Sequence, residues 1–253
     1  LYPHFQEVIE FAKSLELKVN LITNGTYIDK LLRPELQNKI DFVAISLDGQ
    51  RNVHNRIRNN ARSFDEAITA IKKLIQANMP MAVSISVSNS NLSDLPDLID
   101  FLVDLGVQQI QLHPIVAVGR GSELNNSILL TEQERARLFV ISSLLQAQYQ
   151  QRKVNINCDM VPADWVKQNY QINAQTIEYL SNLINPLVVT EYGQLLPFAY
   201  GVNPELALKT DAKYRNIVRP NASILQNIFK RSLNEPQFEY TDWYEDFVHC
   251  SYL

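Results

Sequence analysis

The sequence is poor in cysteine, which excludes small cross-linked folds. Only Cys158 and Cys250 occur among the 253 residues, and they lie far apart. Two distant thiols form neither a disulfide framework nor a local knot of cysteine ligands around a metal. They fit a protein of the reducing cytoplasm, where we expect this chain to be located with both thiols reduced and buried.

Long apolar runs and an excess of positive charge are also missing. No apolar stretch reaches the roughly 18 to 20 residues that a membrane-spanning helix needs, and the first residues do not resemble a signal peptide. The 23 Lys and Arg residues stand against 27 Asp and Glu residues, which gives a net charge of -4. No basic block marks a surface for a phosphate backbone. We therefore expect a soluble globular protein that binds neither membranes nor nucleic acid.

Helical and strand-like patterns alternate through the first 112 residues. Strands are predicted at residues 19–23, 42–47, 81–87 and 107–112, and helices at residues 5–15, 63–75 and 91–102. Ser63 and Glu66 have the spacing of a capping box at the start of the second helix. Because single helices separate the strands, the pattern predicts an α/β fold with a parallel sheet, either doubly wound or curled into a barrel. Ligands bind at the carboxyl ends of the strands in both arrangements.

The alternation becomes less regular after residue 121. Thr131 and Glu134 have capping-box spacing and predict a helix to about residue 150, followed by a strand at residues 154–157. Residues 187–196 predict a β-hairpin, and the remainder is helical and rich in aromatic residues. We place a domain boundary near residue 160, which gives one region over residues 1–160 and a second over residues 161–253.

Polar residues and glycines gather where the predicted strands end. Four of the seven glycines follow predicted strands, namely Gly25, Gly49, Gly119 and Gly121. Ser46 ends an otherwise apolar strand, so its hydroxyl can bond a ligand carboxylate or ribose, or simply its own turn. Arg58 lies in a loop on the same side of the sheet, where it suits a carboxylate ligand, and a solvated basic loop is the alternative.

Other signals of chemistry are weak. His113 ends the fourth strand as a candidate base or ligand, although a lone histidine is more often only hydrogen-bonded. Asp48 is the one carboxylate at a strand end, and capping of its own turn explains it. The sequence has no carboxylate pair of the glycosidase type, no GxSxG elbow and no Walker loop. Composition and spacing alone leave a parallel α/β enzyme of unknown chemistry.

Five short segments then occur in a recognisable order. They are LYP at residues 1–3, LITNG at 21–25, ISLDG at 45–49, HNRIR at 54–58 and SFDE at 63–66. Their order and spacing resemble radical S-adenosylmethionine (radical SAM) enzymes, most of all the branch that matures peptides, sulfatases and redox cofactors. The resemblance covers about the first 120 residues. It implies a partial, parallel (β/α)6 barrel similar to a TIM barrel.

The resemblance also implies which residues bind S-adenosylmethionine. They are Thr23, Asn24, Gly25, Ser46, Arg58, Ser86, Ile115 and Val116. The first three line the pocket after a strand, and Ser46 binds the ribose or the methionyl part. Arg58 resembles the arginine that meets the methionyl carboxylate. Ser86 and the backbone near Ile115 and Val116 complete the adenosine side.

The cysteine motif of radical SAM enzymes is absent. In that family three cysteines spaced CxxxCxxC hold a [4Fe–4S] cluster, whose unique iron chelates S-adenosylmethionine and delivers the electron that cleaves it. We therefore expect that this sequence begins after the first two barrel strands of a longer enzyme, with the cluster ligands upstream of residue 1. The chain as given is then expected to be inactive. In addition, Asn55 replaces an aspartate common in the family, which favours a structural role for His54.

The second region resembles a different part of the same enzymes. Residues 187–198 are similar to the β-hairpin that opens the SPASM or twitch extension, a small α+β region. There the family places a cysteine after a proline, as a ligand of an auxiliary cluster. Phe198 follows Pro197 here, which argues against an auxiliary cluster of the usual kind.

The resemblance thus implies the distal part of a radical SAM oxidoreductase. In the intact enzyme an external electron donor drives cleavage of S-adenosylmethionine, and the resulting 5′-deoxyadenosyl radical abstracts hydrogen from a substrate, expected to be a precursor peptide. One alternative is a cluster-free relative that only binds peptide. Another is a non-radical barrel enzyme of aldolase or isomerase type, which would need a catalytic lysine or a carboxylate pair at strand ends.

Overall fold

A five-stranded parallel sheet forms the centre of the first part of the chain. The computed structural model describes residues 3–115 and 128–160, together with four short strands farther along. The strands of the sheet are β1 (Asn20–Thr23), β2 (Phe42–Ser46), β3 (Met81–Val87), β4 (Gln109–Pro114) and β5 (Asn155–Cys158). They lie side by side in sequence order, and every neighbouring pair is parallel. The predicted parallel α/β fold is confirmed.

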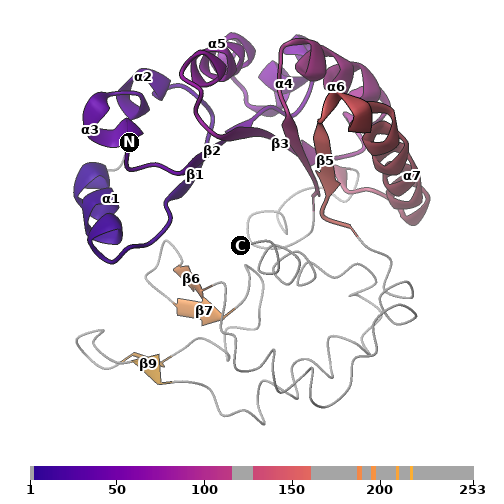
Figure 1. Ribbon diagram of the computed structural model, residues 1–253. Helices are drawn as coiled ribbons and strands as arrows, with labels where there is room; N and C mark the ends of the chain where they lie inside the picture. Colours follow the sequence, from indigo (N-terminus) through magenta and orange to yellow (C-terminus); the bar gives the residue numbers. More distant parts are fainter. Residues whose placement is uncertain are drawn as a thin grey trace. The chain divides into compact units, whose positions relative to one another are not determined.

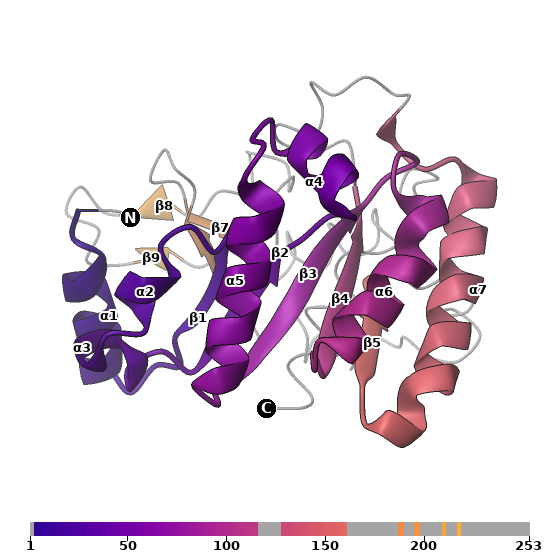
Figure 2. The same cartoon turned by 90° about the horizontal axis from the view of Figure 1, so that it is seen from above.

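The helices cover the convex side of this curved sheet (Figure 1). The helical elements are α1 (Phe5–Ser14), α2 (Ile28–Leu31), α3 (Pro34–Gln37), α4 (Arg51–Ile57), α5 (Ser63–Gln76), the short η1 (Leu92–Asp94), α6 (Leu95–Asp104), α7 (Glu132–Tyr149) and η4 (Gln150–Arg152). Figure 2 shows them as one layer that runs from α1 beside β1 to α7 beside β5. In the described part of the chain, no helix is both long and apolar enough to cross a membrane.

Two of these helices test the capping predictions. The capping box at Thr131 is confirmed, because Thr131 and Glu134 bond each other's backbone N–H. The capping box at Ser63 is wrong, because α5 has no side-chain cap. The Oγ of Ser63 instead lies 2.9 Å from Oδ1 of Asn55, which also accepts the Phe64 N–H at 2.9 Å. The helix therefore starts against Asn55 of the preceding helix α4 rather than on its own serine.

The core lies between the sheet and the helices. Alternate residues of the strands point to opposite faces, and those on the convex side are mostly apolar, with Thr23 beside Ile45 as a polar exception. Seven of them are fully buried at 0% exposure, namely Val43, Ile45, Val83, Ile85, Val87, Ile110 and Leu112. Burial of one such side chain contributes roughly 1.5–3 kcal/mol, so this layer fixes both register and helix position.

The concave face of the same strands has a different character. In the register of the sheet Ser46 pairs with Ser84, Ser84 with Gln111, and Gln111 with Asn157. We call these four residues the polar row. Because pairing partners in neighbouring strands point to the same face, the polar row crosses β2 to β5 on one side of the sheet. Ile22, on the concave side of β1, is 73% exposed, which shows that this face of β1 is open.

The chain separates into two units. One comprises Leu1–Ile115 and Asn125–Cys158, and the other comprises Val116–Leu124 and Asp159–Leu253. Within the second unit, β6 (Leu187–Val189) pairs antiparallel with β7 (Leu195–Pro197), which confirms the predicted hairpin. A second antiparallel pair joins β8 (Lys209–Thr210) to β9 (Ile217–Val218). The SPASM-like assignment and the domain boundary near residue 160 stay predictions, and Phe198 lies outside the described residues.

Candidate functional site

The turn after β1 holds three of the predicted cofactor residues. The Gly25 N–H donates to Oγ1 of Thr23 at 3.2 Å, and the Thr26 N–H donates to Oδ1 of Asn24 at 3.1 Å. Gly25 has a positive φ of 83°, and a Cβ there would lie 2.7 Å from Cβ of Ala70 in α5. Only glycine therefore lets this turn approach α5 so closely.

A buried carboxylate, Asp48, organises the turn after β2. Its side chain is 2% exposed, its Oδ2 accepts a hydrogen bond from Nε of Arg58 at 2.7 Å, and Nη2 of Arg58 forms an ion pair with the same oxygen at 2.7 Å. Its Oδ1 accepts the N–H of Ser86, in β3, at 3.0 Å. A buried carboxylate is costly unless it is paired and hydrogen-bonded, and both conditions are met here. Asp48 thus ties β2, the end of α4 and β3 together.

Asn91 makes the second connection between the same strands. Its Nδ2 donates to the carbonyl oxygens of Asp48 at 2.6 Å and Ser86 at 2.9 Å, while its Oδ1 accepts the Ser88 N–H at 2.8 Å. The backbone ladder between β2 and β3 extends only as far as the bond from the Leu47 N–H to the Ser84 carbonyl. Side chains therefore continue the pairing where the strand ends diverge. We call Asp48, Arg58 and Asn91 the clasp.

His54 supports the clasp from α4. It is 1% exposed, and its Nδ1 accepts the backbone N–H of Asp48 at 3.0 Å. Burial lowers the pKa of His54, the negative charge of Asp48 opposes this shift, and the positive charge of Arg58 adds to it. An accepting Nδ1 assigns the proton of the neutral ring to Nε2. His54 is therefore a neutral residue within the packed structure, consistent with the predicted structural role.

The remaining predicted residues lie at the same sheet edge. Ser46 and Ser86 are half-buried at the ends of β2 and β3, and the Ile115 N–H donates to the Val87 carbonyl at 2.9 Å beside β4. In the described part of the chain no hydrogen bond engages the hydroxyl of Ser46 or of Ser86. Both hydroxyls are thus available to a ligand. Val116 lies outside the described residues.

The residues present do not fit an iron–sulfur cluster. Within residues 3–115 and 128–160 no group of three or more His, Cys, Asp or Glu side chains is placed to hold a metal ion. Cys158 is half-buried at the end of β5, and Cys250 lies outside the described residues. The three cysteine thiolates that hold the [4Fe–4S] cluster of radical SAM enzymes are not found there.

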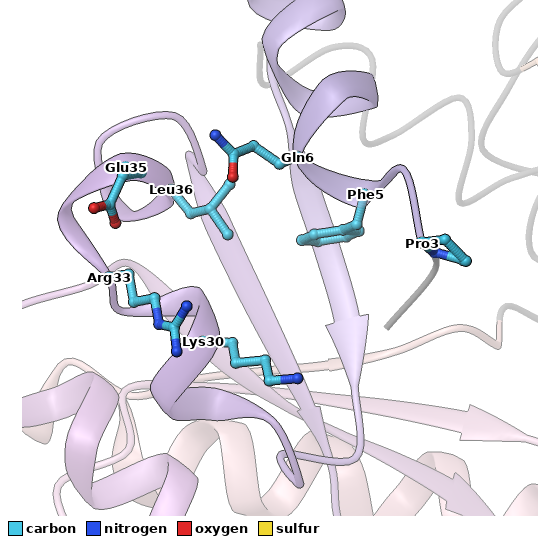
Figure 3. Close-up of a pocket in the computed structure, with 7 residues that line it drawn as sticks. All are labelled: Pro3, Phe5, Gln6, Lys30, Arg33, Glu35 and Leu36. Carbon is cyan, nitrogen blue, oxygen red and sulfur yellow. The ribbon is translucent and has the colours of Figure 1, made fainter.

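A pocket of about 540 Å³ lies away from the predicted cofactor residues, between α1 and the α2–α3 segment (Figure 3). Lys30, Arg33 and Leu36 come from one wall, and Phe5 and Gln6 come from the other. None of the predicted cofactor residues lines it. It belongs to the outer helical layer, where nothing in the structure indicates an occupant.

Comparison with known proteins finds a family model that matches part of the chain. Residues 1–102 match the model of the radical SAM superfamily. Over these residues the chain is similar to radical SAM proteins. The matched residues contain the β1 turn and the whole clasp, so the strand-end cluster described above lies within the matched part.

Two curated relatives match about half of the chain. Fe-coproporphyrin III synthase of Methanosarcina barkeri is 26% identical over 136 residues, 53% of this chain and 34% of the relative. The sporulation killing factor maturation protein SkfB of Bacillus subtilis is 31% identical over 122 residues, 47% of this chain and 29% of the relative. The chain thus spans about a third of the length of these relatives.

A solved structure matches over more of the chain. Streptococcus suis SuiB bound to the precursor peptide SuiA gives a TM-score of 0.59 at 11% identity, over 94% of this chain and 52% of that one. At this identity the likeness concerns the fold alone. It agrees with the partial parallel barrel that the sequence predicts.

The polar row contains residues that the sequence interpretation missed. Gln111 and Asn157 were not predicted as site residues, and neither was Asn155, two residues before Asn157 on the same face of β5. The signal was present as strict alternation of polar and apolar residues at 109–113 (QIQLH) and 155–158 (NINC). This period of two indicates a strand with one polar face, here the concave one.

Proposed function

We propose that this chain is the distal part of a radical SAM enzyme that acts on a peptide. The family match over residues 1–102 carries the proposal, because the strand-end residues predicted to bind S-adenosylmethionine at β1, β2 and β3 lie within it. The peptide is supported by SkfB, which is named as a maturation protein, and by the likeness to SuiB bound to its precursor peptide. The cluster ligands are proposed to lie upstream of residue 1.

S-adenosylmethionine supplies the reactive chemistry in such an enzyme through its reductive cleavage. The part played by this chain is to bind and orient that cofactor. The unengaged hydroxyls of Ser46 and Ser86 are proposed to bond its ribose, methionyl or adenosine groups. Thr23, Asn24 and Gly25 extend the pocket at the end of β1, and the backbone near Ile115 extends it at β4.

Arg58 is proposed to bind the methionyl carboxylate while Asp48 positions it. Arginine has five N–H donors, and Asp48 engages only Nε of Arg58, by a hydrogen bond, and Nη2, by an ion pair. The Nη1 donors are left for a carboxylate ligand, and the side chain is 35% exposed. Asp48 therefore fixes the plane of the guanidinium without occupying all of it.

Titration of S-adenosylmethionine into the chain by calorimetry tests this assignment. We expect Arg58→Ala to weaken binding by about 10- to 100-fold, the effect of one hydrogen bond between charged groups, and Ser46→Ala by about 2- to 10-fold. Arg62→Ala is the control, because Arg62 lies in the same loop with its side chain 83% exposed. Unchanged affinity for S-adenosylmethionine in both site variants refutes the assignment. Ser46→Ala leaves the clasp intact and so stays informative even if Arg58→Ala unfolds. Unchanged affinity in Ser46→Ala alone then refutes the assignment.

A cluster-free protein that only binds peptide is the second candidate. It is favoured by the lack of the CxxxCxxC motif in the sequence and of a suitable donor set among the described residues. In that protein peptide binding is unaffected by Arg58→Ala. Anaerobic reconstitution with iron and sulfide, followed by an assay for 5′-deoxyadenosine, measures the activity of the chain itself, which we propose to be absent.

A further inference from the structure

We propose that Gln111 and Asn157, on the concave face of β4 and β5, bind uncharged amide groups of the substrate. The inference rests on the proposed function and names the chemistry that the site recognises, which is a peptide main chain or a side-chain carboxamide. Gln111 and Asn157 pair directly in the register of the sheet, so their side chains leave the same face at neighbouring positions.

The side chains of the polar row are available to a ligand. In the described part of the chain no hydrogen bond engages the side chains of Ser84, Gln111 or Asn157. Ser84 is only 8% exposed, so its hydroxyl is buried without a partner there, which is costly unless a ligand or water completes it. Gln111 is half-buried and Asn157 is exposed, so a ligand can reach them.

A carboxamide is the chemical complement of a peptide group. It offers two N–H donors and one carbonyl acceptor in a plane, and a peptide group needs one acceptor and one donor. Asn155 adds a third carboxamide, because it pairs with Gln109 two positions earlier on the same strands. The concave side of β4 and β5 therefore presents repeated amide groups along the strand direction.

The lack of charged residues at the concave strand positions favours an amide ligand over an anionic one. The described concave strand positions are Asn20, Ile22, Phe42, Ala44, Ser46, Ala82, Ser84, Ser86, Gln109, Gln111, His113, Asn155 and Asn157, with no Lys, Arg, Asp or Glu among them. Recognition of carboxylates or phosphates normally uses Arg or Lys. The nearby Arg58 pairs with Asp48, and its remaining donors are those proposed for the methionyl carboxylate of the cofactor, so they are not left for the substrate. An uncharged substrate group therefore suits the concave face better than a triphosphate or a propionate.

Side-chain size divides the face into two parts. On β2 and β3 the concave residues are small, with Ala44 against Ala82 and Ser46 against Ser84. On β4 and β5 they are the longer carboxamides. Small side chains leave room for a ligand over β2 and β3, where S-adenosylmethionine is proposed to bind, and the carboxamides then border that space.

Nuclear magnetic resonance of the ¹⁵N-labelled chain tests the inference, since side-chain NH₂ groups give separate signals. Single Ala variants assign the signals of Gln111 and Asn157. The probe is a neutral capped tripeptide, acetyl-alanyl-glycyl-alanine amide, added at saturating S-adenosylmethionine. We expect saturable shifts of both NH₂ signals, and an apparent Kd at least about fivefold weaker in the Gln111→Ala, Asn157→Ala double variant. Gln76→Ala, at an exposed position in α5, is the matched control and leaves the Kd unchanged.

Three outcomes overturn the inference: no shift of the two signals, an unchanged Kd in the double variant, or shifts that appear only with GTP or coproporphyrin III in place of the tripeptide. Broadening of the methyl signal of S-adenosylmethionine reports cofactor binding in the same samples. Absence of this broadening in the unmodified chain, with tripeptide binding retained, refutes the proposed function and leaves the amide site standing. Cofactor binding without tripeptide binding refutes the amide site and leaves the cofactor assignment standing.

Discussion

Replacement of Asn91 by alanine is expected to destabilise the end of the sheet more than any surface change nearby. The substitution removes the partner of three backbone groups at once, the carbonyls of Asp48 and Ser86 and the N–H of Ser88. Asn91 is 2% exposed, so solvent does not replace these bonds without rearrangement. A buried polar group that loses its partner costs about 1–3 kcal/mol. Water that enters the vacated space satisfies some of these three backbone groups. We therefore expect a loss of about 2–4 kcal/mol in the free energy of unfolding.

Urea unfolding followed by circular dichroism measures this loss. Asn89→Ala is the control, because Asn89 is exposed two residues away and bonds Ile128 through its backbone alone. Such a surface change normally stays within about 0.5 kcal/mol. If Asn91→Ala costs no more than Asn89→Ala, the clasp does not hold the strand ends, and the reasoning from buried bonds fails. Where Asn91→Ala still folds, its affinity for S-adenosylmethionine is expected to fall, whereas that of Asn89→Ala does not.

Three further predictions concern other positions. Burial lowers the pKa of His54 below its ordinary 6.5, so the unfolded chain binds more protons than the folded chain in acid. The contribution of His54 to the free energy of unfolding is therefore expected to stay constant above about pH 6.5 and to fall below it. In His54→Gln the free energy of unfolding is expected to fall less steeply in acid. If the urea midpoints of the two proteins change with pH in the same way between about pH 5 and 7.5, this prediction is wrong. Gly25→Ala is expected to lower the midpoint temperature of unfolding more than Gly106→Ala does. Both glycines have a positive φ, but the new Cβ would lie 2.7 Å from Ala70 at position 25 and no nearer than 3.8 Å to any atom at position 106. Equal losses in the two variants would show that the turn moves away from α5 without cost. Because β1 is an edge strand of the sheet and Ile22 is 73% exposed, the chain is expected to self-associate on size-exclusion chromatography, and Ile22→Lys is expected to self-associate less. A monomer at high concentration would contradict this.

The sheet was predictable because its order follows from local patterns. Short strand patterns alternate with helical patterns along the first part of the chain, and helical connections between successive strands favour parallel pairing. The hairpin in the second unit was predictable for a similar reason, since two short apolar runs flank a turn. The start of α5 was not predictable, because Ser63 bonds Asn55, and a capping pattern carries no information about a competing partner in the preceding helix α4.

The clasp illustrates the limit of sequence reasoning at the candidate site. The sequence around Asp48 predicts an ordinary turn cap, yet its carboxylate bonds the Ser86 N–H across 38 positions of sequence. Asn91 carried no signal at all, because its role depends on the divergence of β2 and β3 beyond Leu47. These bonds join groups that approach only after the sheet has formed, so composition and spacing do not reveal them. The family resemblance identified Ser86 and Arg58, and the structure adds that both contact Asp48.

Asp48 also changes what Arg58 can do. An arginine that waits alone at a sheet edge is free to change rotamer, and binding then orders a long side chain at a cost of about 2 kcal/mol in conformational free energy. Arg58 is held by a hydrogen bond and an ion pair to a buried carboxylate that is itself fixed by the Ser86 N–H. Much of that ordering is complete before a ligand arrives. The Asp48 carboxylate also neutralises the charge of Arg58, which weakens its long-range attraction for anions in general. The direction of the Nη1 donors of Arg58 then decides which anion binds. If Arg58 binds the methionyl carboxylate as proposed, this arrangement favours a carboxylate presented at one place over anions in general, as a methionyl group of fixed orientation requires.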